Sequence, residues 1–184
     1  MMKYNPDIHK RKSIRLKHFN YSSNGAYFIT LCTKNRECIL GNIVNGKMVL
    51  SDLGEIVKNE WNKTPMIRHE IKLDIFIIMP NHFHGIIFIT NNNVMAIEYI
   101  NVGATGRSPL RKQNGPLQYS LGSFIGGLKS ITTKRANVLR NTPHQSLWQR
   151  NYYEHVIRND VDLNRIREYI INNPIQWQFD LNHL

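Results

Sequence analysis

The chain has few cysteines and no long apolar run, and each shortage excludes a class of protein. Its only two cysteines, Cys32 and Cys38, are too few for a disulfide framework and wrongly spaced for a zinc clip, so we expect both to be reduced and structural. No apolar stretch reaches the ~18 residues of a membrane span, and the N-terminus lacks the apolar core of a secretion signal. These absences predict a cytoplasmic protein with no membrane partner.

Acidic residues are also scarce. The sequence has 13 Asp and Glu against 24 Lys and Arg, which gives a formal net charge of +11. No acidic residue occurs from Tyr99 to Tyr153, and a second basic run, HKRKSIRLKH, lies near the N-terminus. A single basic run can be a solvated surface, but two runs with aromatic residues between them favour a nucleic-acid partner. The candidate DNA contacts in the acid-free stretch are Arg111, Lys112, Lys129, Lys134, Arg135, Arg140 and Arg150.

A chain of 184 residues with 41% hydrophobic content fits one domain with some length left over. We expect a basic extension at 1–24, a single catalytic domain at 25–184, and within it a long mobile loop at about 91–118, where NNN, GATG and NGP interrupt any periodicity.

The predicted elements are a strand at 25–35, a hairpin at 37–51, a helix at 51–66, strands at 72–78 and 82–90, an amphipathic helix at 120–140, a strand at 146–158 and a helix from Asn159 or Asp160 to Asn173. This order predicts an α+β fold of ferredoxin-like type, an antiparallel sheet with packed helices and an added C-terminal helix.

Two histidines flank a phenylalanine in the stretch from Met79 to Thr90, MPNHFHGIIFIT. The β-branched and aromatic residues around them favour a strand over a helix. Because side chains alternate along a strand, His82 and His84 point the same way and Phe83 points into the opposite layer. Adjacent neutral imidazoles are good metal ligands, but two ligands do not close a site, and two packed histidines with no chemical role are the alternative.

The C-terminal stretch DVDLNRIREYIINNP supplies a partner for the histidines. Leu163, Ile166 and Ile170 form the buried stripe of its predicted helix, and Tyr169 lies about 60° around from Ile166. Asn173, four residues later, shares that edge. The helix therefore presents a phenol and an amide one turn apart, although a rim tyrosine and a C-terminal amide cap would give the same pattern.

Three motifs in this order resemble the single-tyrosine HUH transposases, and within them the REP-associated tyrosine transposases. They are MPNHFHGII, LWQRNYYEHVIRN and YIINNP, and the resemblance covers most of the chain from Gly25 to Pro174. The order of the histidines first and the tyrosine last is similar to transposases and replication initiators and opposite to conjugative relaxases. Each motif alone is weak, whereas the three in order are specific.

The resemblance implies an enzyme that cleaves and rejoins single-stranded DNA at hairpin-type repeats through a 5′-phosphotyrosine intermediate. It implies that Tyr169 is the nucleophile and that His82, His84 and Asn173 hold a divalent metal, Mg or Mn, with no nucleotide cofactor. Asparagine departs here from the commoner insertion-sequence pattern, in which glutamine often fills this position. The implied partner is single-stranded or hairpin DNA, bound by a monomer or a homodimer.

Two neighbouring tyrosines, Tyr152 and Tyr153, are rival nucleophiles. On a strand, Tyr152 and Glu154 share one face while Tyr153 and His155 share the other. Glu154 and His155 could join the metal ligands, but we expect these residues to be structural or to orient the metal ligands through hydrogen bonds. Two other functions fit parts of the sequence: a single-stranded nucleic-acid-binding protein without catalysis, and an unrelated phosphoesterase that uses metal-bound water.

Overall fold

The computed structural model describes residues 19–90 and 116–179. Most of the predicted basic extension and of the predicted loop at 91–118, including Arg111 and Lys112, lies outside the described residues. The strands are β1 (Gly25–Cys32), β2 (Gly41–Val44), β3 (Lys47–Leu50), β4 (Ile71–Met79), β5 (His82–Ile89) and β6 (Tyr153–Ile157). The helices are α1 (Asp52–Asn62), α2 (Thr64–Ile67), α3 (Leu121–Arg140) and α4 (Asp160–Asn172), with short 3-10 turns at Lys34–Arg36 and Trp177–Phe179.

Four strands form one antiparallel sheet in the order β4-β5-β1-β6, and β2 and β3 form a separate hairpin. The sheet strands and the two long helices between them follow one another as β1, α1, β4, β5, α3 and β6, which is the ferredoxin-like order. The predicted α+β class and antiparallel sheet are therefore confirmed. The hairpin predicted at 37–51 turns at Asn45 and Gly46, both with positive φ, a pair typical of two-residue hairpin turns.

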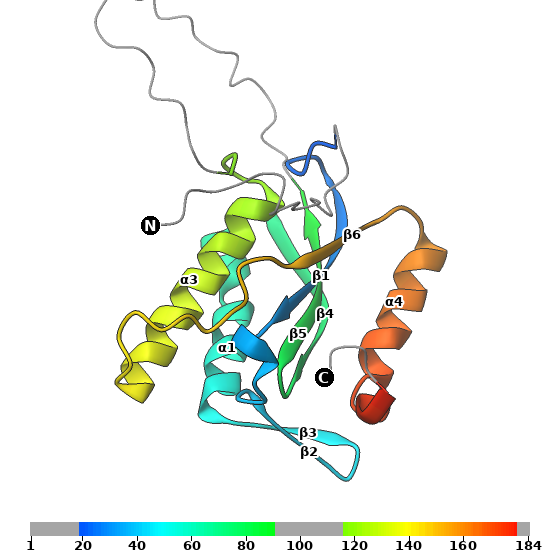
Figure 1. The fold of residues 1–184 in the computed structure, drawn as a ribbon. Coiled ribbons are helices and arrows are strands. Elements are labelled where there is room, and N and C mark those ends of the chain that lie inside the picture. Colours follow the sequence, from blue (N-terminus) through cyan, green and yellow to red (C-terminus); the bar gives the residue numbers. More distant parts are fainter. Residues whose placement is uncertain (1–18, 91–115, 180–184) are drawn as a thin grey trace, which may run out of the picture.

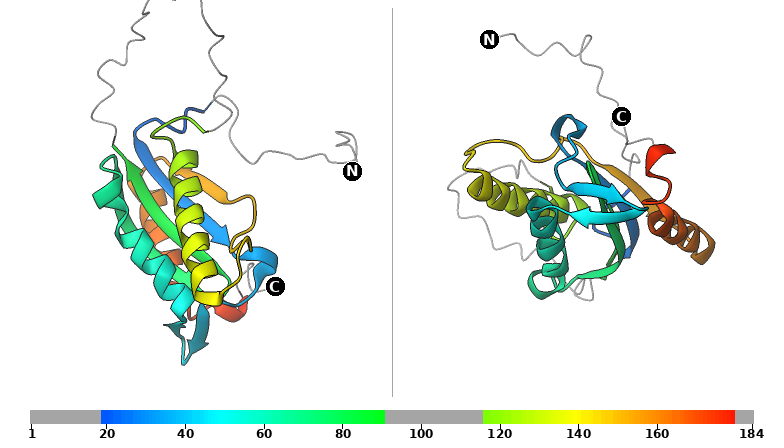
Figure 2. Two further views of the ribbon diagram at one scale, coloured as in Figure 1. Left: turned by 90° about the vertical axis from the view of Figure 1, so that its left-hand side faces the viewer. Right: turned by 90° about the horizontal axis from the view of Figure 1, so that it is seen from below.

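Helices cover both faces of the sheet (Figures 1 and 2). Helices α1 and α3 pack on one face and α4 lies on the other, so the sheet is the middle of three layers. The larger apolar core lies under α1 and α3, and a smaller apolar cluster that includes Ile166 and Ile170 lies under α4. The buried stripe predicted for the C-terminal helix is thus confirmed, with Leu163 packed partly buried against the same cluster.

The centre of the larger core requires a glycine in β5. A Cβ on Gly85 would lie 2.8 Å from the ring of Trp61, which comes from α1 and is completely buried. The indole also packs against Phe83, with ring centroids 4.6 Å apart. This close contact between α1 and the sheet places Phe83 and Gly85 on the face toward α1. Because side chains alternate along a strand, His82 and His84 then lie on the opposite face.

Local signals explain most helix boundaries. Ser51, Ser120 and Asn159 each accept a hydrogen bond from a backbone N–H of the first turn, and so cap α1, α3 and α4. The single helix predicted at 51–66 is wrong in one respect, because it divides into α1 and α2 at Lys63. Pro65 explains the division, since it lacks an N–H and cannot continue the preceding helix. Among the described residues, no helix is both long and apolar enough to cross a bilayer.

Candidate active site

The two histidines open strand β5 directly after the turn at Pro80 and Asn81. Their side chains point toward α4, whereas Phe83 packs into the core under α1 and α3, as predicted from strand alternation. The imidazole centroids are 4.4 Å apart, and the two residues are 0% and 1% exposed. The pair is thus buried on the face that α4 covers.

Each histidine is held through its Nδ1 atom. The Oδ1 of Asn81 lies 2.8 Å from His82 Nδ1, and the Oγ1 of Thr30 on β1 lies 2.8 Å from His84 Nδ1. A carbonyl-type oxygen can only accept, so the proton of neutral His82 lies on Nδ1 and its Nε2 carries the lone pair. Neighbouring side chains that fix an imidazole in this way are typical of metal ligands.

Helix α4 brings Tyr169 to this pair. Its phenol oxygen lies 3.3 Å from His84 Nε2, and the two rings are 5.2 Å apart. Tyr169 is 41% exposed, so it lies at the edge of the buried stripe, as predicted. Arg167 fixes the helix against the sheet, because its Nε and Nη2 donate to Asp74 Oδ2 at 2.9 and 2.6 Å, at the irregularity in β4.

The chain after Tyr169 passes along the same histidines. Asn173 is the C-cap of α4, one turn after Tyr169, and is 2% exposed. Four residues later, the ring of Trp177 lies 5.9 Å from that of His82. Asn173 is therefore a buried residue in a largely exposed segment, between two aromatic residues that each contact one histidine.

Comparisons with known proteins address the family and the fold. No protein-family model matches the chain. An uncharacterised protein of Haemophilus influenzae is 46% identical over 182 residues, which cover 97% of this chain and 96% of that protein. The chain belongs to the same family as this protein. A solved structure of a REP-associated tyrosine transposase bound to a REP hairpin superposes with a TM-score of 0.59 and 16% identity, over 92% of this chain and 76% of that one. The fold is therefore that of a REP-associated tyrosine transposase, and the predicted resemblance is confirmed at the level of the fold.

Within this transposase fold, the rival tyrosines Tyr152 and Tyr153 lie on opposite faces of the sheet. Tyr152 packs against the core under α1 and α3. Tyr153 lies on the α4 side of β6, is 50% exposed and packs edge-on against Phe28, with ring centroids 6.2 Å apart. The predicted alternation of this strand is therefore confirmed.

The two residues expected to support the metal ligands occupy different places. Glu154 is buried on the opposite face from the histidines, near Tyr27. Burial, followed by the charges of Tyr21 and Glu154, raises the pKa of Tyr27 to about 12. His155 is on the histidine side, and its Nε2 lies 2.7 Å from Asp162 Oδ2. The structure does not bring Glu154 to the histidine pair, because strand alternation sends it to the other layer; Asn81 and Thr30 hold the imidazoles instead.

His82, His84 and Asn173 carry donor atoms of the kinds that bind divalent cations in proteins. No group of three or more His, Cys, Asp or Glu side chains in the described part of the chain is arranged to hold a metal. A site here would consist of the Nε2 atoms of His82 and His84 and the amide oxygen of Asn173. None of these donors is charged, so phosphate oxygens of a bound strand or water molecules would complete the coordination.

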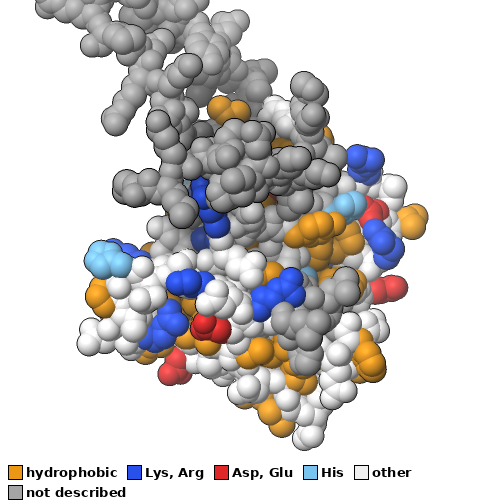
Figure 3. All heavy atoms as spheres, viewed as in Figure 1, with side chains coloured by type: hydrophobic (Ala, Val, Ile, Leu, Met, Phe, Trp, Pro, Cys, Tyr) orange, Lys and Arg blue, Asp and Glu red, His pale blue; other side chains and the backbone are white. Residues whose placement is uncertain are grey.

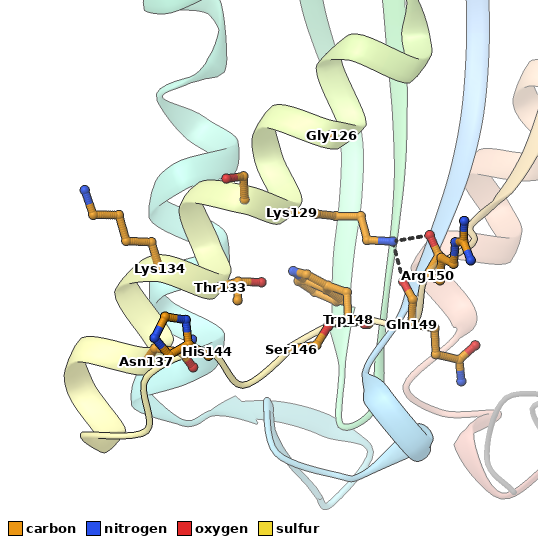
Figure 4. Close-up of a pocket in the computed structure, with 11 residues that line it drawn as sticks. Gly126, Lys129, Thr133, Lys134, Asn137, His144, Ser146, Trp148, Gln149 and Arg150 are labelled. Carbon is orange, nitrogen blue, oxygen red and sulfur yellow. Dashed lines mark hydrogen bonds between the residues drawn. The ribbon is translucent and has the colours of Figure 1, made fainter. Parts of the chain in front are cut away.

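Some of the predicted DNA contacts bind other groups of the protein, and others line a cavity without acidic residues in the described part of the chain. Lys129 reaches from α3 to the segment before β6 and donates to the carbonyl oxygens of Gln149 and Arg150 (Figure 4). It also donates to the carbonyl oxygen of Asn151. Burial lowers the pKa of its ammonium group. Lys129 therefore fixes the backbone that leads into β6 and is not available to a phosphate.

The other basic residues are placed around the outer side of α3. Arg135 lies 3.1 Å from Glu60 of α1, so its charge is shared with an acidic partner. Lys134 and Arg150 line a cavity of about 460 Å³ between α3 and residues 144–150, whose described lining contains no acidic side chain. The Nε and Nη2 of Arg140 have no hydrogen-bond partner among the described residues. Figure 3 shows basic side chains spread across this face, with a few acidic ones among them.

Sequence reasoning missed three residues of the site. Thr30 and Asn81 hold the imidazoles, and Trp177 covers His82. Asn81 immediately precedes His82 and could have been recognised as a turn residue whose side-chain oxygen can accept a hydrogen bond. Thr30 and Trp177 carry no local signal, because only strand pairing and the path of the chain after α4 bring them to the histidines.

Proposed function

We propose that this protein cleaves and rejoins single-stranded DNA, with Tyr169 as the nucleophile. The observation that carries the proposal is the 3.3 Å distance between the phenol oxygen of Tyr169 and Nε2 of His84. A phenol at the edge of a helix, beside two imidazoles fixed through Nδ1, combines a nucleophile with a site for charge stabilisation.

In the proposed reaction, the Tyr169 oxygen forms a bond to the scissile phosphorus and the bond from phosphorus to the 3′ oxygen breaks. The phenol gives up its proton to solvent and the departing 3′ oxygen takes one up, so the products are a 5′-phosphotyrosine and a free 3′-hydroxyl. Because the phosphotyrosine retains the phosphodiester linkage, a second 3′-hydroxyl can displace the tyrosine and rejoin the strand without a nucleotide cofactor.

His82, His84 and Asn173 would hold a divalent metal, Mg or Mn. When bound, this ion would neutralise the charge that develops on the phosphate oxygens and orient the phosphate. The chain itself fixes both imidazoles through Asn81 and Thr30 and limits water around them by burial. The proposal thus assigns ligand binding to β5 and nucleophilic attack to α4.

The proposed substrate is single-stranded or hairpin DNA, and the protein acts as a monomer or a homodimer. The solved relative with this fold is bound to a REP hairpin, which supports DNA as the partner class. We further infer that the residue 25–184 domain binds the strand with help from the basic extension and the loop at 91–118. Of the described cations, Lys134 and Arg150 are the best placed for phosphates, because both line the acid-free cavity.

The salt dependence of DNA binding tests that assignment. Log affinity falls as log salt rises, and each of Lys134→Ala and Arg150→Ala should reduce the steepness of this fall by about 0.7 for a single strand. Lys58→Ala, which removes an equal charge on α1, is the matched control and should leave the slope unchanged. Equal slopes for all four proteins would remove Lys134 and Arg150 from the interface.

The decisive experiment for the reaction uses labelled single-stranded DNA from the flanks of the protein's own gene, incubated with Mg or Mn and separated by denaturing electrophoresis. The wild type should leave a protein–DNA band that survives denaturant, whereas Tyr169→Phe, which keeps the ring, should leave none. Mass spectrometry that finds the nucleotide on Tyr152 or Tyr153 would overturn the assignment. Cleavage without an adduct would support metal-bound water, and salt-dependent binding without cleavage would support a non-catalytic binding protein.

A further inference from the structure

A second cavity is lined in part by Tyr169. It has a volume of about 310 Å³ and is built from β1, β6 and α4. This volume lies at the lower end of the ~300–1,000 Å³ range of small-molecule sites, so it suits one planar group and not a duplex. Its lining residues are Phe28, Tyr153, His155, Arg165, Ile166 and Tyr169.

Three aromatic rings form the inner part of this cavity. Phe28 lies between the two tyrosines, with its centroid 6.2 Å from Tyr153 at 68° and 6.2 Å from Tyr169 at 86°. Tyr169 is also the residue whose phenol oxygen lies at His84. A molecule in the cavity would therefore touch the ring whose oxygen is the proposed nucleophile.

The exposure of Tyr153 has no explanation in the packing of the fold. It lies on the edge strand β6 and is 50% exposed. Exposed tyrosine rings are typical of surfaces that bind a partner, because the ring offers a flat apolar face at a low entropic cost. In single-strand binding proteins such rings stack on bases.

Hydrogen-bond donors lie at the rim. The carboxylate of Asp162 is 2.7 Å from Arg165 Nη2 and 2.7 Å from His155 Nε2, and so holds both side chains. Arg165 is one helical turn before Tyr169 and its side chain is 72% exposed. Asp162 offsets the charge of Arg165, which disfavours a phosphate at this point, while the planar guanidinium can still stack on a base or donate to its edge. Figure 3 shows a histidine with basic, acidic and apolar side chains together on the β6 and α4 side of the molecule.

We propose that this cavity binds the nucleobase of a nucleotide that flanks the scissile phosphate, with Tyr153 as the stacking residue and Arg165 at the base edge. The proposal rests on the proposed function for the identity of the strand. Aromatic walls with a few polar donors match a nucleobase, which has two apolar faces and a polar edge. Binding one flanking base here would position the adjacent phosphate at the Tyr169 oxygen.

The first test removes the base and the ring separately. In the gene-flank DNA, an abasic nucleotide is placed on either side of the mapped cut. At one of the two positions it should lower kcat/KM of the wild type by about tenfold, the effect of losing one stacked base. Tyr153→Leu should lower kcat/KM on intact DNA by a similar factor, and the abasic nucleotide should then have little further effect. Tyr119→Leu, which removes another half-exposed tyrosine, is the control and should behave as the wild type.

Two results of this test would overturn the proposal. One is a wild type that is insensitive to an abasic nucleotide at both positions. The other is a set of effects that multiply, because independent losses would mean that Tyr153 and the base do not interact. The abasic DNA tests the site in unmodified protein, so the result does not depend on the folding of the variant.

The second test is independent of cleavage. An oligothymidylate of ~16 nucleotides with one 2-aminopurine is titrated with full-length Tyr169→Phe protein, whose ring is intact. Stacking on Tyr153 should quench the fluorescence, and the additional substitution Tyr153→Leu should remove this quenching and weaken binding by about tenfold. Equal quenching with and without Tyr153 overturns the base site. If the wild type makes no adduct but the quenching depends on Tyr153, the proposed reaction fails and the base site stands.

Discussion

The two faces of the central sheet use the same strands and differ in what they bury. The face under α1 and α3 buries large apolar groups, with Tyr27, Trp61 and Phe83 completely inaccessible. The face under α4 has a smaller apolar cluster and, beside it, the buried polar side chains of His82 and His84. Burying polar groups stabilises little and requires partners, so this second face has the composition of a site and the first that of a core.

Strand β5 alone demonstrates this division. Alternate residues of one strand face opposite layers, so Phe83 belongs to the core and its two neighbours belong to the site. A residue that stabilises the core, Phe83, is thus adjacent in sequence to two residues of the candidate site, His82 and His84. Substitutions on the two faces should therefore affect different measurements.

The largest expected contrast is between Phe83→Ala and His84→Ala. Phe83→Ala opens a cavity against Trp61 and should lower the free energy of unfolding by about 3–5 kcal/mol. His84→Ala unpairs Thr30 and should lower it by about 1–2 kcal/mol, yet should reduce DNA cleavage by at least ~100-fold with little change in DNA affinity. Urea unfolding, adduct formation and DNA titration measure the three quantities. Cleavage by His84→Ala at the wild-type rate would contradict the division.

A glycine on the core face gives the next contrast. In Gly85→Ala the new methyl group would meet the Trp61 ring at 2.8 Å, so the free energy of unfolding should fall by about 1–3 kcal/mol. Gly127→Ala in α3 adds the same group where nothing lies within 4 Å, and should raise stability by about 0.5–1 kcal/mol. Changes of equal sign in the two variants would show that the helix and sheet are less closely packed at Gly85 than we describe.

The attachment of α4 to the sheet should affect activity more than stability. The ion pair between Arg167 and Asp74 is partly exposed, with side chains 38% and 20% accessible, so Arg167→Ala should cost about 0.5 kcal/mol of unfolding free energy. Because this pair fixes the helix that carries Tyr169, the rate of adduct formation should fall by about tenfold. Asp74→Ala should have the same effect, and the double variant should be no slower than either. Rates that multiply in the double variant would exclude a shared positioning role.

Local patterns in the sequence predicted much of this architecture for identifiable physical reasons. Strand alternation placed both histidines on one face, and helical periodicity placed Tyr169 at the edge of a buried stripe, because each depends only on the geometry of its own element. The helix break at Pro65 was missed because apolar periodicity continues across it. The positions of Glu154 and Thr30 depend on which strands become neighbours in the sheet, which no local pattern specifies.

The same limit explains the predicted cations. The sequence shows that Lys129 is positive, but only the folded chain brings carbonyl oxygens of residues 149–151 to its ammonium group. A basic residue in an acid-free stretch can therefore be a structural donor. The candidate base site beside Tyr169 was hidden for a comparable reason, since its three aromatic rings come from β1, β6 and α4.

The smallest expected effect concerns the polar rim on the α4 face. Hydrogen bonds from Arg165 and then from His155 lower the pKa of Asp162 below its usual value of 3.8. A carboxyl whose pKa is lower in the folded state contributes stability above pH 3.8 and loses it as the pH falls through the folded value. Asp162→Asn should therefore be less stable than the wild type near neutral pH, and the difference should shrink as the pH is lowered below 3.8.

Asp160→Asn removes a charge from the same first turn of α4 and controls for the helix dipole. Urea unfolding of the three proteins across this pH range measures the effect, and a difference between Asp162→Asn and the wild type that persists undiminished in acid would show that Asp162 does not act through its charge.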